Sequence, residues 1–191
     1  FYGCSALSSI VLSENIAEIE QYTFYDCDSL SEITLGSGLE SVGRNAFSYC
    51  DELDTVYYTG TLLDWCEIQF TIPASNGCFQ TEWDLYINDK LAEDIEIPHG
   101  VRTIKTTAFF LCKSLKSVII PDSVTDIQDW AFGRCNNLSD VSLGNGVTDI
   151  SNNAFPRSGA LQYTLYSNAY YLGNAANPYI ALIYGEETAT T

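Results

Sequence analysis

The seven cysteines are the residues of this chain best suited to chemistry. Zinc sites use short ligand pairs such as Cys-x₂-Cys, and the chain contains no such pair, so no metal site is expected. Cys66 and Cys78 form either a disulfide in an oxidising compartment or two free thiols. The other five recur at one phase of a repeat, which predicts a buried ladder of free thiols: Cys4, Cys27, Cys50, Cys112 and Cys135.

The single histidine and the glycine pairs do not indicate catalysis. His99 lies between Pro98 and Gly100 in a predicted turn, whereas a nucleophilic triad needs a histidine held by a partner within a cleft. The Gly-x-Gly sequences at 36–38 and 144–146 also fall at turns, and neither begins a long helix that would bind phosphate. We therefore expect no catalytic residues, no cofactor and no enzymatic activity.

The charge excludes two classes of partner. The chain carries 25 acidic and 8 basic residues, a formal charge of −17, whereas nucleic acids and anionic membranes attract basic patches. No apolar run approaches the roughly 20 residues of a membrane helix, so we predict neither a nucleic-acid partner nor membrane insertion. Residues 1–89 hold 15 acids and one base, a net charge of −14. Within them, Asp28 and Asp51 share a repeat phase; they are either calcium ligands or part of a solvated acidic surface.

The cysteines and turn residues described above recur within an internal repeat, which sets their positions in the fold. Each unit is too short to bury its own apolar face, so the units must stack into a solenoid. Apolar residues at alternate positions, such as Ile33 and Leu35, predict one short strand per unit with both side chains in the core. The repeat is most visible in phenylalanines that recur every 23 residues, with one longer interval: Phe1, Phe24, Phe47, Phe109, Phe132 and Phe155.

The repeat resembles the BspA-type, or Treponema-type, leucine-rich repeat. The stretch from Leu115 through Pro121 to Ile127, followed by Ala131-Phe132 and Cys135, carries the resemblance. It covers about three quarters of the chain and rests on many positions in register. The resemblance implies a surface or secreted bacterial protein associated with adhesion and with binding of host or matrix proteins.

The predicted fold is mainly β: a right-handed leucine-rich-repeat solenoid of 23-residue repeats with a small α+β insertion. Residues 1–58 and 95–162 form the repeats, and residues 59–94 are the insertion. Within the insertion we expect a helix at 62–70, capped by Thr61, a loop at 71–82 and a hairpin that turns at Asn88-Asp89. Residues 163–185 are expected to form a C-terminal hairpin or cap, with one strand at 163–172 and another at 179–184, before a tail at 186–191.

Strand alternation predicts a surface for binding. The residue between each inward pair must face outward, on the opposite side from the core. An ordinary solvated sheet face is the alternative. These outward residues form a mostly polar strip: Val11, Thr34, Tyr57, Glu96, Ile119 and Ser142. The insertion begins next to Tyr57, so we expect a shallow site there, with Trp65 or Trp83 contributing to one wall.

The leading interpretation is a non-enzymatic binding or adhesion module of an extracellular or cell-surface bacterial protein. Its partner would be a protein or a glycan, recognised through the extended surface of the solenoid. The alternative is a spacer or targeting segment of a larger secreted enzyme. Neither the ligand nor the oligomeric state follows from the sequence.

Overall fold

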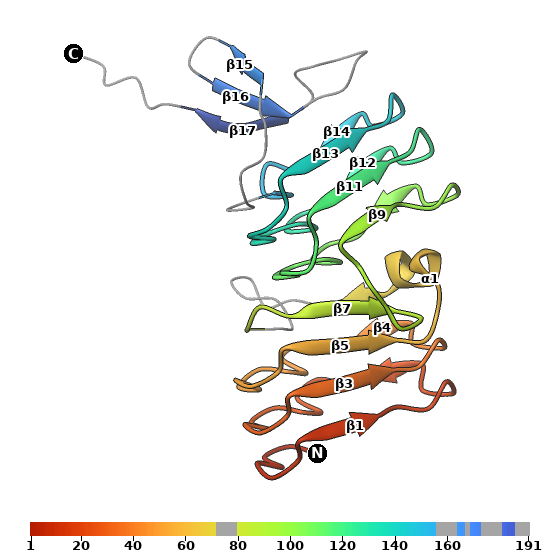
Figure 1. Ribbon diagram of the computed structural model, residues 1–191, viewed down its shortest axis with the longest axis vertical. Coiled ribbons are helices and arrows are strands. Elements are labelled where there is room, and N and C mark those ends of the chain that lie inside the picture. The colour runs from red at the N-terminus through yellow and green to blue at the C-terminus, as the bar shows by residue number, and fades with distance from the viewer. Residues whose placement is uncertain (72–79, 156–163, 167–168, 173–180, 186–191) are drawn as a thin grey trace, which may run out of the picture.

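The protein is a mainly β solenoid, as predicted from the repeat (Figure 1). The computed structural model describes residues 1–71, 80–155, 164–166, 169–172 and 181–185. Each repeat gives one front strand and one short back strand, and equivalent strands of successive repeats pair in parallel. The strands therefore stack rung upon rung along the long axis of the molecule, with the N-terminus at the bottom of Figure 1.

The front strands form two sheets instead of one. The first sheet has the order β1-β3-β5-β7-β8, and the second has the order β13-β11-β9. The two-residue strand β8 pairs antiparallel to β7 and is the last strand of the first sheet. The bounds are β1 (Ser9–Val11), β3 (Glu32–Leu35), β5 (Thr55–Tyr58), β7 (Asp84–Ile87), β8 (Lys90–Leu91), β9 (Asp94–Glu96), β11 (Ser117–Ile120) and β13 (Asp140–Leu143).

The back strands are divided at the same level of the stack. Their two sheets have the orders β2-β4-β6 and β10-β12-β14. The bounds are β2 (Glu18–Ile19), β4 (Ser41–Val42), β6 (Gln69–Phe70), β10 (Thr103–Ile104), β12 (Asp126–Ile127) and β14 (Asp149–Ile150).

Phenylalanine rings fill the space between front and back. Phe24 and Phe47 stack with ring centroids 5.4 Å apart, and Phe109 and Phe132 stack at 5.2 Å. Phe24, Phe47, Phe109 and Phe132 are all buried, which confirms the predicted ladder. Three of the alanines that precede a phenylalanine are buried as well, and their carbonyls accept the backbone N–H of the phenylalanine one turn earlier: Ala46 from Phe24, Ala131 from Phe109 and Ala154 from Phe132. A small side chain lets these backbones approach.

The cysteine ladder is present and adds a hydrogen bond to each interior rung. The Cys50 thiol donates to the carbonyl of Phe24 at 3.0 Å, and the Cys135 thiol donates to that of Phe109 at 3.0 Å. Cys27, Cys50, Cys112 and Cys135 are buried free thiols, as predicted. Cys4, on the first rung, is half-buried.

The insertion continues the stack instead of standing beside it. Its strand β7 pairs in parallel with β5, and its strand β6 pairs in parallel with β4. The helix α1 (Leu62–Glu67) connects β5 to β6 and begins at the predicted cap, Thr61, which forms a reciprocal capping box with Asp64. The predicted helix was too long: Ile68 is extended, because residues 69–70 form β6. Much of the predicted loop, residues 72–79, lies outside the described residues.

The C-terminal segment forms a separate antiparallel sheet of three strands, β15 (Thr164–Tyr166), β16 (Ala169–Leu172) and β17 (Ala181–Gly185). The predicted pairing of the last two strands is present. The stretch expected to be one strand is two, because β15 and β16 pair with each other at Tyr166 and Ala169. The predicted tail at 186–191 lies outside the described residues.

Candidate functional site

The predicted outward strip is divided between the two front sheets. In the first sheet, Thr34 pairs with Val11 on one side and Tyr57 on the other. In the second sheet, Ile119 pairs with both Glu96 and Ser142. Val11 is 77% exposed and Ile119 is 50% exposed, whereas Thr34 and Tyr57 are half-buried. These six side chains therefore lie on an accessible face, but in two groups.

Tyr86 is a member of the strip that sequence reasoning missed. It pairs with Tyr57 across β5 and β7, and the ring centroids lie 4.9 Å apart with planes inclined by 31°. The missed signal was the Leu-Tyr-Ile sequence at 85–87, which has the same alternation as the Val-Tyr-Tyr sequence of β5. Tyr57 and Tyr86 form an aromatic pair on the front face, which we call the tyrosine pair.

A shallow depression of about 510 Å³ lies beside the tyrosine pair. It contains ring, hydroxyl, amide and carboxylate groups but no basic side chain. We call it the Tyr57 depression. Its lining residues come from β3, β5 and the turns after β5 and β7: Glu32, Thr34, Tyr57, Tyr58, Thr59, Asn88 and Asp89.

Backbone geometry fixes one end of the Tyr57 depression. Asn88 and Asp89 both have positive φ angles, 48° and 60°, as a tight two-residue hairpin turn requires. The Asn88 amide nitrogen Nδ2 donates to the carbonyl of Gly60 at 3.0 Å, and the Asn88 backbone N–H donates to the carbonyl of Tyr58 at 3.0 Å. The hairpin predicted at Asn88-Asp89 is thus confirmed and is tied to the repeat below it.

The floor of the depression includes a buried phenol. Tyr58 is almost fully buried, and its hydroxyl donates to the carbonyl of Ser37 at 3.4 Å. Burial, with a smaller effect of Asp64, raises the pKa of Tyr58 to about 12. Its phenol is therefore protonated at neutral pH and serves as a structural support.

Trp65 and Trp83 do not contribute to a wall of the site, contrary to the prediction. They are 0% and 1% exposed, with their rings 5.9 Å apart. Trp65 Nε1 donates to the carbonyl of Ala108 at 3.0 Å, and Trp83 Nε1 donates to that of Phe110 at 2.9 Å. Large apolar rings with a satisfied N–H favour the core, where they join the two halves of the solenoid. The insertion supplies Tyr86, Asn88 and Asp89 to the surface in their place.

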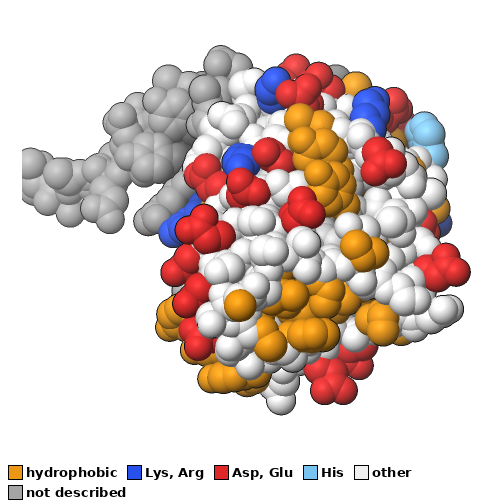
Figure 2. Space-filling model, turned by 60° about the horizontal axis from the view of Figure 1, so that its bottom comes forward, with side chains coloured by type: hydrophobic (Ala, Val, Ile, Leu, Met, Phe, Trp, Pro, Cys, Tyr) orange, Lys and Arg blue, Asp and Glu red, His pale blue; other side chains and the backbone are white. Residues whose placement is uncertain are grey.

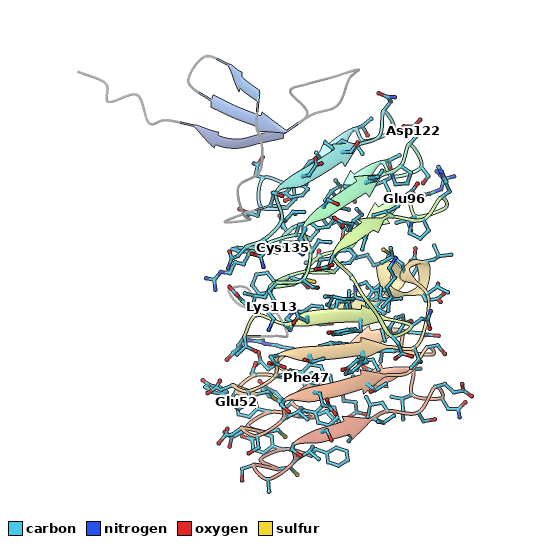
Figure 3. All side chains as sticks on the ribbon, in the orientation of Figure 1. Phe47, Glu52, Glu96, Lys113, Asp122 and Cys135 are labelled. Carbon is cyan, nitrogen blue, oxygen red and sulfur yellow. The ribbon has the colours of Figure 1, made fainter. Side chains whose placement is uncertain are left out.

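The other candidate groups remain apart from this site. His99 is exposed on the turn after β9, one repeat before Asp122. Figure 3 shows Asp122 and Glu52 at opposite ends of the front strands. Cys66 is a buried free thiol, and Cys78 lies outside the described residues. Asp28 and Asp51 are exposed, and the described part of the chain contains no group of three or more metal-binding side chains. In the same part, no helix is long and apolar enough to cross a membrane.

The surface around the stack is dominated by acids. Figure 2 shows acidic side chains along one side of the molecule and hydrophobic side chains gathered in its central part. Three ion pairs join described residues, Lys105 to Glu67, Lys113 to Asp84 and Lys116 to Glu93, and each includes a base from the second half. The first half therefore retains most of its negative charge.

A coil of short parallel strands, with a ladder of buried phenylalanines and an extended outward face, is the architecture of a leucine-rich-repeat protein. The chain matches the BspA type leucine rich repeat region in six copies over residues 1–72 and 84–179. It therefore belongs to this family, whose members are typically non-enzymatic repeat proteins and whose fold is in general a module for protein interaction.

Solved structures include several similar repeat proteins. A leucine-rich repeat protein of T. pallidum is 27% identical, with a TM-score of 0.45, over 78% of this chain and 63% of that one. A leucine-rich repeat protein of Eubacterium ventriosum is 22% identical, with a TM-score of 0.40, over 86% and 36% of the two chains. A leucine rich cell surface protein of Faecalibacterium prausnitzii is 21% identical, with a TM-score of 0.31, over 81% and 72%. The chain thus spans less than two thirds of the first two proteins. Among curated proteins no significant match was found.

Proposed function

We propose that this chain is a non-enzymatic adhesion module of an extracellular bacterial protein, which binds a protein or a glycan through the front face of the solenoid. The Tyr57 depression is the observation that carries this proposal. It combines an aromatic pair with hydroxyl, amide and carboxylate groups on a rigid sheet. Tyrosine gives a large contact area with little loss of conformational entropy, which suits a binding surface.

The architecture supports recognition over an extended face. Strands β3, β5 and β7 hold their outward side chains in fixed register, so a partner meets a preorganised surface. Ile119 supplies a second exposed apolar contact on the neighbouring sheet. Membership of the BspA-type repeat family supports an extracellular site of action.

The proposal is tested on arrays of matrix proteins and glycans. We expect at least one specific partner, and we expect Tyr57→Ala and Ile119→Ser to weaken its binding while the melting temperature changes little. Tyr49→Ala is the matched control, because Tyr49 is also an exposed tyrosine, 50% exposed, but lies on a turn away from the front face. If both front-face variants bind as tightly as the parent while His99→Ala abolishes binding, the front face is not the docking surface.

A further inference from the structure

We propose that the Tyr57 depression receives an arginine side chain from a basic segment of a protein partner. This inference rests on the proposed function and narrows it, because it selects a protein over a glycan and states the charge of the segment that docks. Three features of the described residues support it: an aromatic face, carboxylates that no described base neutralises, and the charge of the surrounding half of the molecule.

The aromatic face belongs to Tyr57. The ring of Tyr86 stacks against one side of the Tyr57 ring, at a centroid distance of 4.9 Å. Thr34 is the register neighbour on the other side, and its side chain is too short to cover an aromatic ring. Both Thr34 and Tyr57 line the depression. One face of Tyr57 is therefore open to a planar group, and guanidinium groups stack on such faces through the ring quadrupole.

The carboxylates lie at the rim of the same depression. Glu32 is on the strand that carries Thr34, and Asp89 is on the hairpin turn after β7. Both are exposed, and the three ion pairs among described residues involve other acids. The nearest base along the chain, Lys90, lines a neighbouring hollow with Leu62 and Ile87. A guanidinium on Tyr57 would thus find carboxylate and threonine oxygens for its N–H groups, which are donors only.

The charge of the first half selects a cationic partner. Residues 1–89 carry a net charge of −14, since 15 acids face a single base, Arg44. Such a field attracts basic segments and repels acidic proteins and anionic glycans. A neutral glycan would also stack on tyrosine and donate its hydroxyls to the carboxylates, but it would leave their negative charge without a counter-charge. An arginine side chain can stack on the Tyr57 ring and pair with the carboxylates at the same time, so it is the occupant that best fits the depression.

The test uses two short peptides that differ in charge but hardly in shape. Acetyl-Gly-Arg-Gly-amide is titrated into the full chain by NMR, and the same peptide with citrulline in place of arginine is the control, because its ureido group is planar and neutral. We expect the resonances of Tyr57, Thr34 and Glu32 to shift, and the arginine peptide to bind about tenfold more tightly. Binding should weaken as salt is added, since exposed charges are screened.

Matched variants locate the effect. Tyr57→Leu and Glu32→Gln should each weaken the arginine peptide about two- to five-fold. Glu52→Gln makes the same change of charge on an exposed turn residue outside the depression and should have no comparable effect. Equal binding of the two peptides, equal losses from Glu32→Gln and Glu52→Gln, or displacement of the arginine peptide by methyl glucoside at lower concentration than by free arginine amide would each overturn the proposal.

The outcome separates this inference from the broader one. If the peptide fails these tests while an array partner still depends on Tyr57, the arginine assignment is wrong and the binding module stands. If the array partner is also insensitive to Tyr57→Ala and Ile119→Ser, both proposals are wrong.

Discussion

At the scale of single residues, burial in the repeat raises the pKa of the ladder thiols. Each interior ladder cysteine lies in the apolar space beside a phenylalanine, and burial is the largest cause of its raised pKa. The pKa of Cys50 rises from its ordinary value of 9.0 to about 12, that of Cys112 rises to about 11, and that of Cys135 rises well above 9.0. The thiols are therefore protonated, poor nucleophiles at physiological pH.

These shifts predict a loss of stability in alkali. Above pH 9 the unfolded chain releases the Cys50 proton, whereas the folded chain keeps it up to about pH 12. The unfolded state then binds fewer protons, so the contribution of Cys50 to stability is complete below pH 9 and declines as the pH rises towards 12. In urea titrations between pH 9 and 10.5, Cys50→Ala should lose stability less steeply than the parent, by about 1.4 kcal/mol per pH unit. Val56→Ala, a core truncation without a titratable group, should keep the parent slope. Equal slopes in all three proteins would contradict the assigned shift.

At the scale of the elements, the phenylalanine ladder should dominate the stability of each rung. Phe132 stacks between Phe109 and Phe155, with centroid distances of 5.2 and 5.0 Å, and is fully buried. Phe132→Ala removes both ring contacts and leaves a cavity, so it should lower the free energy of unfolding by about 3–5 kcal/mol in urea denaturation. Phe1→Ala is the matched control on the same ladder. Phe1 is 60% exposed and should cost far less. A loss below about 1 kcal/mol for Phe132→Ala would mean that the ring is not in the core.

The elements also show how far the sequence predicts the structure. The period of 23 residues placed Phe24, Cys50 and the outward Tyr57 correctly, because each recurs at one phase and the phase fixes its direction. The period is interrupted after Tyr58, and there the prediction failed. Trp65 and Trp83 were expected near the surface but are buried. A segment that occurs once has no repeat phase, so its sequence does not indicate which side chains will face the core. Tyr86 was missed for the same reason: its strand was recognised, but its parallel pairing with β5 is a long-range contact that local patterning does not encode.

At the scale of the whole molecule, two half-solenoids meet at a tryptophan junction. Front and back sheets both change at this level, and α1 lies between β5 and β6. The hydrogen bonds from Trp65 to Ala108 and from Trp83 to Phe110 cross the junction, as does the bridge between Trp83 and Cys112. In a repeat array, stability is shared through such nearest-neighbour interfaces, so this junction sets whether the halves unfold together.

Weakening the junction should uncouple the halves. Trp65→Phe and Trp83→Phe keep an aromatic ring but remove the crossing N–H donors, leaving the carbonyls of Ala108 and Phe110 without these bonds. Each should cost about 1–3 kcal/mol. In hydrogen exchange, the double variant should show earlier opening of one half, whereas the parent should show a common opening for residues 30–58 and 95–150. Trp130→Phe changes a half-buried tryptophan whose ring packs on Phe110 within the second half, and it should keep the common opening. Separate opening already in the parent would contradict the coupling.

The buried tryptophan pair makes intrinsic fluorescence a measure of the state of the junction. Two of its three tryptophans lie at the junction with exposures of 0% and 1%, and the third, Trp130, is half-buried. Two of the three indoles that fluoresce therefore lie at the meeting point of the halves, in a dry environment that favours a blue emission maximum. A red shift in the intrinsic fluorescence would mark water entering between the half-solenoids. The chain thus carries an internal optical probe at the position where its repeat is interrupted.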